Sequence, residues 1–188
     1  MRVGILGGSF DPIHHGHLIV AQALREQLAL DEVRLVPAGA QPFKGGRHAA
    51  SAGHRANMVA LATEGEPGLI TDRSELERPG PSYTVVTLRE LRARLPGAEL
   101  LLLVGSDAAA ELPTWHEAEE IPTLATVVAF RRPGEVAPAP GAVAVPAVAI
   151  SSTEVRARVR AGRSIRYWVP ERVADYIATH RLYQEVSA

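Results

Sequence analysis

Short apolar runs alternate with helical patterns along most of the chain, and this alternation constrains the fold more than any other feature. Apolar residues recur at helical spacing from Leu18 to Leu28 and again from Val85 to Leu95. A repeated order of strand and helix predicts an α/β fold, a Rossmann-like doubly wound parallel sheet with helices on both faces. The runs with the composition of buried parallel strands are RVGIL (2–6), EVRLV (32–36), LIT (69–71), ELLLLV (99–104) and TVVAF (126–130).

The last third of the chain has a different pattern. Residues 131–148 carry four prolines and predict a loop with one short strand. The stretches STEVRARVRA and PERVADYIATH that follow predict two C-terminal helices. With 188 residues and no long linker, we expect one domain over residues 1–188.

Composition excludes several classes of function. The net charge is −1 and the basic residues are scattered, which argues against an extended nucleic-acid surface or an acidic-membrane surface. The absence of cysteine excludes a disulfide framework, a thiolate nucleophile and a Cys-ligated zinc. The N-terminal MRVGILGG lacks a long apolar segment, so we expect a cytoplasmic protein without a membrane anchor. A homo-oligomer is compatible with this composition but is not predicted by it.

The segment GGSFDPIHHGH (7–17) joins the first strand to the first helix through paired glycines. A helix N-terminus offers unpaired N–H groups and partial positive charge, so this junction predicts a phosphate site. Neither GxxxxGK[ST] nor GxGxxG is present here, which argues against the two common nucleotide loops. The distinguishing residues are His14 and His17, whose imidazoles can donate to phosphate oxygens.

Simpler interpretations of this segment exist. A glycine-rich turn serves tight packing as readily as phosphate binding, and His15 is explained by solvent exposure. Three close histidines also suggest zinc. However, ligands at positions 14, 15 and 17 do not converge easily, and HExxH is missing from the chain.

A second segment, ISSTEVR (150–156), predicts a helix start. A capping box with Ser151 at the N-cap and Glu154 reaching back explains part of it. It does not explain Arg156, because a cation is unfavourable near a helix N-terminus unless an anion binds nearby. Ser152, Thr153 and Arg156 therefore predict a second phosphate clamp.

The two segments together strongly resemble a known family. GGSFDPIHHGH and ISSTEVR are similar to the motifs of nucleotidyltransferases that carry (H/T)xGH and an ISSTxIR-like sequence, and among these to the nicotinate-mononucleotide adenylyltransferases of bacteria. Gln41, Phe43 and Val155 depart mildly from the usual residues of that family. Further segments resemble the family in the same order along the chain, namely QPFK (41–44), PSYTVVTL (81–88), LLVGSDAAAELPTWHE (102–117) and VPERVADYIATHRLY (169–183).

The resemblance implies transfer of AMP from ATP to nicotinate mononucleotide, with Mg²⁺, giving deamido-NAD and pyrophosphate. It implies that His14, His17, Lys44 and Arg156 are the catalytic residues. It places the loop Gly7, Gly8, Ser9 and Phe10 and the residues Ser152 and Thr153 around the ATP phosphates. Adenosine would contact Gly105 and Asp107, and the nicotinate end would contact Tyr83, Thr84 and Trp115.

Alternatives remain open at this point. Lys44 can also be explained as a solvated lysine, Asp107 as the N-cap of the helix DAAAEL, and Trp115 as core packing beside a capping box of Thr114 and Glu117. The function could also be that of a related transferase with nicotinamide mononucleotide or phosphopantetheine as the acceptor. A catalytically silent nucleotide sensor and a zinc hydrolase are the more distant possibilities.

Overall fold

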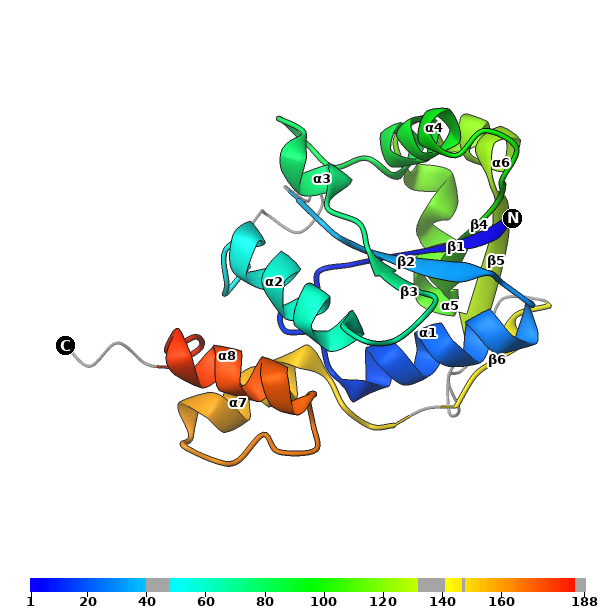
Figure 1. Cartoon of the computed structure of the whole chain (residues 1–188). Coiled ribbons are helices and arrows are strands. Elements are labelled where there is room, and N and C mark those ends of the chain that lie inside the picture. The colour runs from blue at the N-terminus through cyan, green and yellow to red at the C-terminus, as the bar shows by residue number, and fades with distance from the viewer. Residues whose placement is uncertain (40–47, 132–140, 147, 185–188) are drawn as a thin grey trace.

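A parallel sheet of six strands forms the centre of the molecule (Figure 1). The structure is a computed structural model and describes residues 1–39, 48–131, 141–146 and 148–184. Every neighbouring pair of strands is parallel, in the order β3-β2-β1-β4-β5-β6. The strands are β1 (Arg2–Gly8), β2 (Glu32–Pro37), β3 (Leu69–Thr71), β4 (Glu99–Gly105), β5 (Thr126–Arg131) and β6 (Val143–Ala144).

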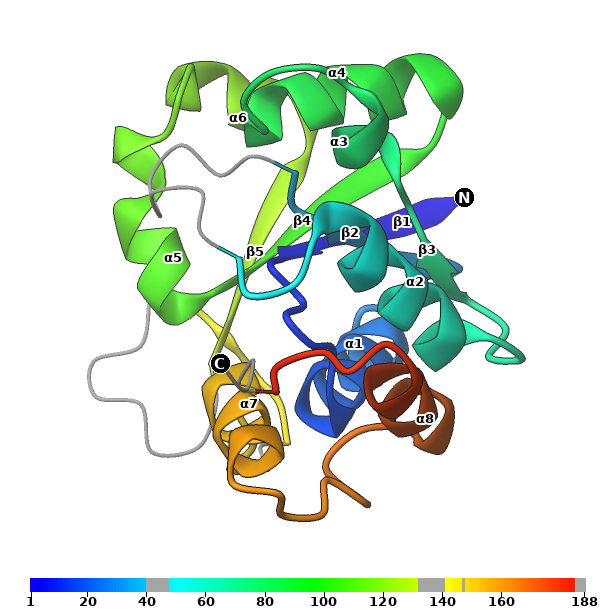
Figure 2. The same cartoon turned by 90° about the vertical axis from the view of Figure 1, so that its left-hand side faces the viewer.

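Helices cover both faces of this sheet (Figures 1 and 2). One face carries α1 (His15–Gln27), α2 (Ala52–Thr63), α7 (Ser152–Arg160) and α8 (Glu171–Thr179). The other carries α4 (Thr84–Arg94) and α6 (Ile121–Leu124). The shorter elements are α3 (Ser74–Glu77), α5 (Ser106–Glu111), η1 (Leu112–Thr114) and η2 (Ala118–Glu120).

The central strands are buried on both faces because each helical layer packs on alternate side chains. On β4, Leu101 and Leu103 belong to the core under α1 and α8, whereas Leu100, Leu102 and Val104 belong to the core under α4 and α6. Successive strand residues point to opposite faces, so an almost unbroken apolar run supplies two cores at once. This explains why the strand stretches contain so few polar residues.

The strand order reverses between β1 and β4. The chain runs outward from β1 through β2 to β3, then returns to the other side of β1 for β4, β5 and β6. Ligands in open α/β sheets bind at the carboxyl ends of the strands where such a reversal occurs. We therefore expect a ligand site among the residues that follow β1 and β4.

The structure confirms the predicted fold class, the predicted strands and the C-terminal helices. β1 continues through both glycines of the loop, and the helical stripes end earlier than predicted, since Leu28 and Leu95 are C-cap residues. The sequence analysis did not predict the helices α2, α3 and α6 or the short turns η1 and η2. Among the described residues, no helix is long and apolar enough to span a bilayer.

Candidate active site

The glycine loop, which we define as residues 7–10 at the end of β1, is tightly packed at one glycine and open at the other. A Cβ on Gly8 would lie 2.9 Å from Cζ of Phe10, so no larger residue fits there without a shift. A Cβ on Gly7 would meet no described atom within 4 Å, which leaves this stretch of backbone accessible. Phe10 is buried and has a φ of 46°, in the left-handed region that residues other than glycine seldom adopt.

The two histidines of the motif stack on one another at the start of α1. His14 is the N-cap residue, and its backbone N–H donates to Nδ1 of His17 at 3.3 Å. Their ring centroids lie 3.7 Å apart with 24° between the planes, and Phe10 contacts the His17 ring edge-on at 5.0 Å. Because Nδ1 of His17 accepts a hydrogen bond, a neutral His17 carries its proton on Nε2.

Gly16 lies between the two histidines and permits this stack. A Cβ at this position would approach Nδ1 of His14 to 3.0 Å, closer than ordinary contact distance. Gly16 is therefore required by the packing of the His14 ring, and this requirement is independent of the glycine loop. His15 uses its backbone N–H to contact the carbonyl of Trp168 at 3.0 Å, which ties the start of α1 to the C-terminal third of the chain.

The ISSTEVR segment meets the loop after β1, as the phosphate-clamp hypothesis requires. Ser151 is the N-cap of α7 and accepts from the Glu154 N–H at 3.1 Å, which confirms the predicted N-cap. The Ser152 hydroxyl donates to the Pro12 carbonyl at 2.9 Å. Nη1 of Arg156 donates to the Asp11 carbonyl at 2.7 Å, and its Nη2 donates to Oγ1 of Thr153 at 3.3 Å. These side chains therefore hold the loop backbone.

A cavity of about 590 Å³ opens at the carboxyl ends of β1 and β4, at the point where the strand order reverses. Sequence reasoning did not identify several polar residues that line it, among them Glu75, Ser82, Thr87, Glu111 and His116. His14, Ser152, Thr153 and Arg156 do not line the cavity, and Lys44 lies outside the described residues. Most of the predicted residues do line it, namely Gly7, Gly8, Ser9, Phe10, His17, Tyr83, Thr84, Gly105, Asp107 and Trp115.

One end of the cavity is aromatic. Tyr83 is the N-cap of α4, and His116 stacks on its ring with centroids 4.1 Å apart. Nε2 of His116 lies 3.0 Å from a carboxylate oxygen of Glu117. Trp115 is half-buried and packs against the α4 side of the core while it also lines the cavity. The end defined by these rings is suited to a flat heterocycle.

The capping box that would have explained Trp115 is absent. Thr114 closes η1 and donates its hydroxyl to the Glu111 carbonyl at 2.7 Å. Glu117 is the N-cap of η2 with a φ of 49°, so the two residues do not bracket one helix start. Two short 3-10 helices follow each other closely here, so the T-x-x-E pattern does not form a capping box.

The N-cap interpretation of Asp107 is also wrong. Gly105 ends β4 and is itself the N-cap of α5, and Asp107 lies one residue inside the helix. Oδ1 of Asp107 turns back over Gly105, where a Cβ would come within 2.8 Å of it. Asp107 is exposed and lines the cavity, so its carboxylate is available to a ligand.

A buried arginine, which was not predicted from the sequence, donates to the backbone of the glycine loop. Arg55 of α2 is 1% exposed and donates to the Ser9 carbonyl at 2.7 Å and to the Ala38 carbonyl at 2.6 Å. Burial lowers the pKa of Arg55, an effect that the negative charge of Asp11 opposes. The stretch HRANMV contains nothing that distinguishes this arginine from a surface residue of an ordinary helix.

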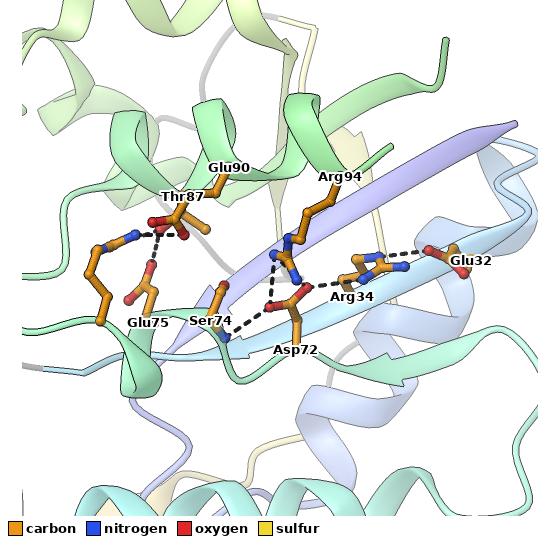
Figure 3. Close-up of polar contacts among 9 residues, drawn as sticks. Glu32, Arg34, Asp72, Ser74, Glu75, Thr87, Glu90 and Arg94 are labelled. Carbon is orange, nitrogen blue, oxygen red and sulfur yellow. Dashed lines mark hydrogen bonds and ion pairs between the residues drawn. The ribbon is translucent and has the colours of Figure 1, made fainter. Parts of the chain in front are cut away.

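A second polar network holds the segment that leads to Tyr83 (Figure 3). Asp72 follows β3, is 3% exposed, and accepts from Nη1 of Arg34 at 3.0 Å and from Nη2 of Arg94 at 3.1 Å. The Ser74 N–H adds a third donor at 3.0 Å. Burial opposes ionisation of Asp72, but hydrogen bonds from Ser74 and Arg34 and the charge of Arg94 outweigh it and lower its pKa.

A neighbouring set of polar contacts, between α3 and α4, lies at the cavity. Oγ1 of Thr87 donates to the Glu75 carboxylate at 2.7 Å, and both residues line the cavity (Figure 3). The Gly39 N–H donates to Oγ of Ser82 at 3.1 Å, and a Cβ on Gly39 would lie 2.4 Å from the Glu75 carbonyl oxygen. This close approach joins the end of β2 to the segment that presents Tyr83 and Thr84.

Comparison with known proteins places this geometry in a family. The cytidylyltransferase-like family matches residues 5–158. A probable nicotinate-nucleotide adenylyltransferase of Thermus thermophilus is 50% identical over 188 residues, which cover 98% of this chain and 100% of the relative. A protein of the same name from Thermomicrobium roseum is 46% identical and covers 100% of this chain and 94% of its own length.

Solved structures agree on the fold. The Plasmodium falciparum nicotinic acid mononucleotide adenylyltransferase complexed with NaAD superposes with a TM-score of 0.76 at 20% identity, over 97% of each chain. At that identity the likeness establishes the architecture alone. Together with the relatives of about half-identical sequence over the whole length, the family model shows that this chain belongs to the cytidylyltransferase-like family and, within it, to the nicotinate-nucleotide adenylyltransferases.

Proposed function

We propose that the chain transfers the AMP moiety of ATP to nicotinate mononucleotide, forming nicotinate adenine dinucleotide (deamido-NAD) and pyrophosphate. The observation that carries this proposal is the composition of the one cavity described above. Its floor is the glycine loop with His17 at the start of α1, and its far end is the aromatic group Tyr83, Trp115 and His116. Such a cavity suits two ligands whose phosphates meet at the glycine loop, one of which carries a flat ring.

The chemistry that this arrangement supports requires no general base. The acceptor is a phosphate monoester, which is largely a dianion near neutral pH because its second pKa is about 6. One of its oxygens attacks the α-phosphorus of ATP, and the bond from that phosphorus to the bridging oxygen of the β-phosphate breaks, so that pyrophosphate leaves with the electron pair. Catalysis then consists of alignment and of stabilising the negative charge on the α-phosphate.

The residues around the glycine loop supply that stabilisation. The backbone of Gly7, Gly8 and Ser9 lies beside the positive end of the α1 dipole, and both favour bound phosphates. His17 lines the cavity and donates from Nε2 to an α-phosphate oxygen, whereas His14 holds the His17 ring in place through the stack and the N-cap contact.

The C-terminal motif and Lys44 are proposed to assist at the triphosphate in different ways. Ser152 donates to Pro12 and Arg156 donates to Asp11 and to Thr153, which supports a role of this motif in ordering the phosphate site. Lys44, outside the described residues, is proposed as an additional cation for the triphosphate.

The two ends of the cavity divide the substrates between them. Gly105 and the exposed carboxylate of Asp107 are proposed to contact the adenosine ribose. Trp115 is proposed to stack on the nicotinate ring, with Thr84 and nearby N–H groups of α4 directed at its carboxylate. Tyr83, under His116, completes this end.

We infer that a divalent cation, Mg²⁺, enters as part of the ATP substrate. Among the described residues, no group of three or more His, Asp or Glu side chains is arranged to hold a metal ion. The cavity carries separate carboxylates, such as Asp107 and Glu111, that are compatible with a hydrated ion bound mainly by phosphate oxygens. The cation would neutralise charge on the departing pyrophosphate.

A pyrophosphate-release assay tests the proposal. The purified chain with ATP and Mg²⁺ is expected to release pyrophosphate with nicotinate mononucleotide, more slowly with nicotinamide mononucleotide, and not with phosphopantetheine. Chromatography should identify the dinucleotide product. A clear preference for the amide or for phosphopantetheine would assign the chain to a different acceptor. A chain that binds ATP and releases no pyrophosphate with any acceptor would be a sensor, and stoichiometric zinc in the purified protein would favour a hydrolase.

A further inference from the structure

Asp11 lies inside the loop that connects the glycines to His14, and its carboxylate is buried, with 4% of the residue exposed. One oxygen, Oδ2, accepts from the Ala49 N–H at 2.7 Å. The other, Oδ1, accepts from the Ala50 N–H at 3.1 Å and from the Tyr183 hydroxyl at 2.7 Å. Two segments that are remote in sequence therefore donate to this one side chain.

Tyr183 lies in the segment that follows α8, 172 residues away from Asp11 in sequence. It is 9% exposed and has a φ of 63°, which turns the chain so that its ring enters the core. Burial and the hydrogen bond to Asp11 raise the pKa of Tyr183, so its hydroxyl remains a proton donor at neutral pH. A neutral hydroxyl that donates to a buried carboxylate makes a strong, charge-assisted hydrogen bond.

The backbone of the same loop is held from two further helices. Arg55 of α2 donates to the Ser9 carbonyl at 2.7 Å, and Arg156 of α7 donates to the Asp11 carbonyl at 2.7 Å. Residues 9–12 are thus fixed between the glycines on one side and the stacked histidines on the other. The carboxylate of Asp11 is the contact through which the 49–50 segment and the C-terminal segment both act on this loop.

We propose that Asp11 and Tyr183 are positioning residues for the transfer reaction, which hold loop 9–14 so that the glycine-loop backbone and the His17 ring keep their transition-state geometry. Neither residue needs to touch a substrate. Displacements of about 1 Å at a site of alignment cost on the order of 100-fold in rate, so a loosened loop lowers kcat. This proposal rests on the proposed function, because it takes His17 as the group that acts on the α-phosphate.

The test compares two tyrosines that each lose one hydroxyl. Tyr183→Phe removes the donor to Asp11. Tyr176→Phe is the control, because the Tyr176 hydroxyl also makes two partly buried side-chain contacts, to Asn57 at 3.0 Å and His54 at 2.9 Å, but none to the loop. We expect Tyr183→Phe to lower kcat at least 10-fold with less than a threefold change in the KM of ATP, and Tyr176→Phe to keep kcat within twofold of wild type.

A double-mutant cycle assigns the effect to the contact. Asp11→Ala removes both carboxylate oxygens, which also accept from Ala49 and Ala50, and it is expected to lower kcat at least as much as Tyr183→Phe. Adding Tyr183→Phe to Asp11→Ala should then change kcat by less than threefold, because the hydrogen bond that Tyr183 makes to the loop is already lost. Fully multiplicative effects, or equal losses of kcat in Tyr183→Phe and Tyr176→Phe, would overturn the proposal.

Hydrogen exchange on the full chain gives a readout that is independent of turnover. Tyr183→Phe should raise amide exchange in a peptide that covers residues 8–17, whereas Tyr176→Phe should not. If the wild-type chain releases no pyrophosphate with any acceptor, the proposed function fails, and the exchange comparison still decides whether Tyr183 holds the loop. Unchanged exchange in Tyr183→Phe refutes the positioning role whatever the activity of the chain.

Discussion

His14 and His17 form one unit, because the backbone N–H of His14 donates to Nδ1 of His17 and the two rings stack 3.7 Å apart. Only His17 lines the cavity, and His14 is 6% exposed beneath it. The motif suggests equal roles for the two imidazoles, but their positions differ and so their roles differ too. We assign the contact with the reacting phosphate to His17 and the orientation of its ring to His14.

Replacing His17 by alanine should lower kcat about 100-fold or more, since it removes a donor aimed at charge that develops in the transition state. His17 is only half-buried, so the free energy of unfolding should fall by about 1 kcal/mol or less. Steady-state kinetics and thermal unfolding of the same preparation measure both effects. The control is His15→Ala, whose kcat should stay near wild type. Loss of folding in His17→Ala would mean that this imidazole serves packing.

Replacing Gly16 by alanine should impair catalysis through sterics alone. The new Cβ would lie 3.0 Å from Nδ1 of His14, so the ring must move and the stack on His17 is disturbed. We expect roughly a 10-fold loss of kcat. Gly53→Ala is the matched control, because Gly53 is also the second residue of a helix and its Cβ would meet no described atom within 4 Å. That variant should retain full activity and gain up to about 1 kcal/mol in stability. Equal kcat values in the two variants would contradict the steric role of Gly16.

The sequence predicts the sheet well because each buried strand is a continuous apolar run, a signal that needs no knowledge of neighbours. The run ELLLLV becomes β4, and its alternate residues fill two cores. The helix α2 was missed because AGHRANMVALAT has small apolar residues and no clear stripe. Its position is set by tertiary contacts, such as those that bury Arg55 beneath the glycine loop.

The candidate site was predictable where local sequence determines geometry. Both motifs for which we predict phosphate binding begin a helix, and the structure brings them together at the loop after β1. The sequence does not show which polar side chains donate to backbone carbonyls of the loop and which ones face a ligand. Ser152 and Arg156 donate to the loop and do not line the cavity, and Asp11 accepts from a tyrosine 172 residues away. These pairings depend on the folded topology and leave no periodic signal.

Replacing Trp115 by alanine should weaken the acceptor and spare ATP. The indole lines the aromatic end of the cavity, far in sequence from the glycine loop, and an aromatic contact of about 1.4 kcal/mol corresponds to a tenfold effect on affinity. We therefore expect the KM of nicotinate mononucleotide to rise about 10-fold while the KM of ATP changes less than twofold. Trp115→Phe should recover most of the loss. Equal increases in both KM values would instead indicate that Trp115 supports the core beside α4.

Replacing Asp72 by asparagine should destabilise the fold in a pH-dependent way. Its folded-state pKa lies below the ordinary value of 3.8, so the carboxylate stabilises the native state above that value and loses this contribution as the pH falls through the folded-state pKa. At pH 7 the variant should lose about 1 to 3 kcal/mol, because two arginines lose a buried charged partner. Urea unfolding from pH 7 to pH 3 measures this, and the gap between wild type and variant should narrow as the pH falls below 3.8. The control Glu99→Gln alters an exposed pair with Arg2 and should follow the wild-type curve closely. A gap that stays constant down to pH 3 would show that Asp72 contributes through shape and not through charge.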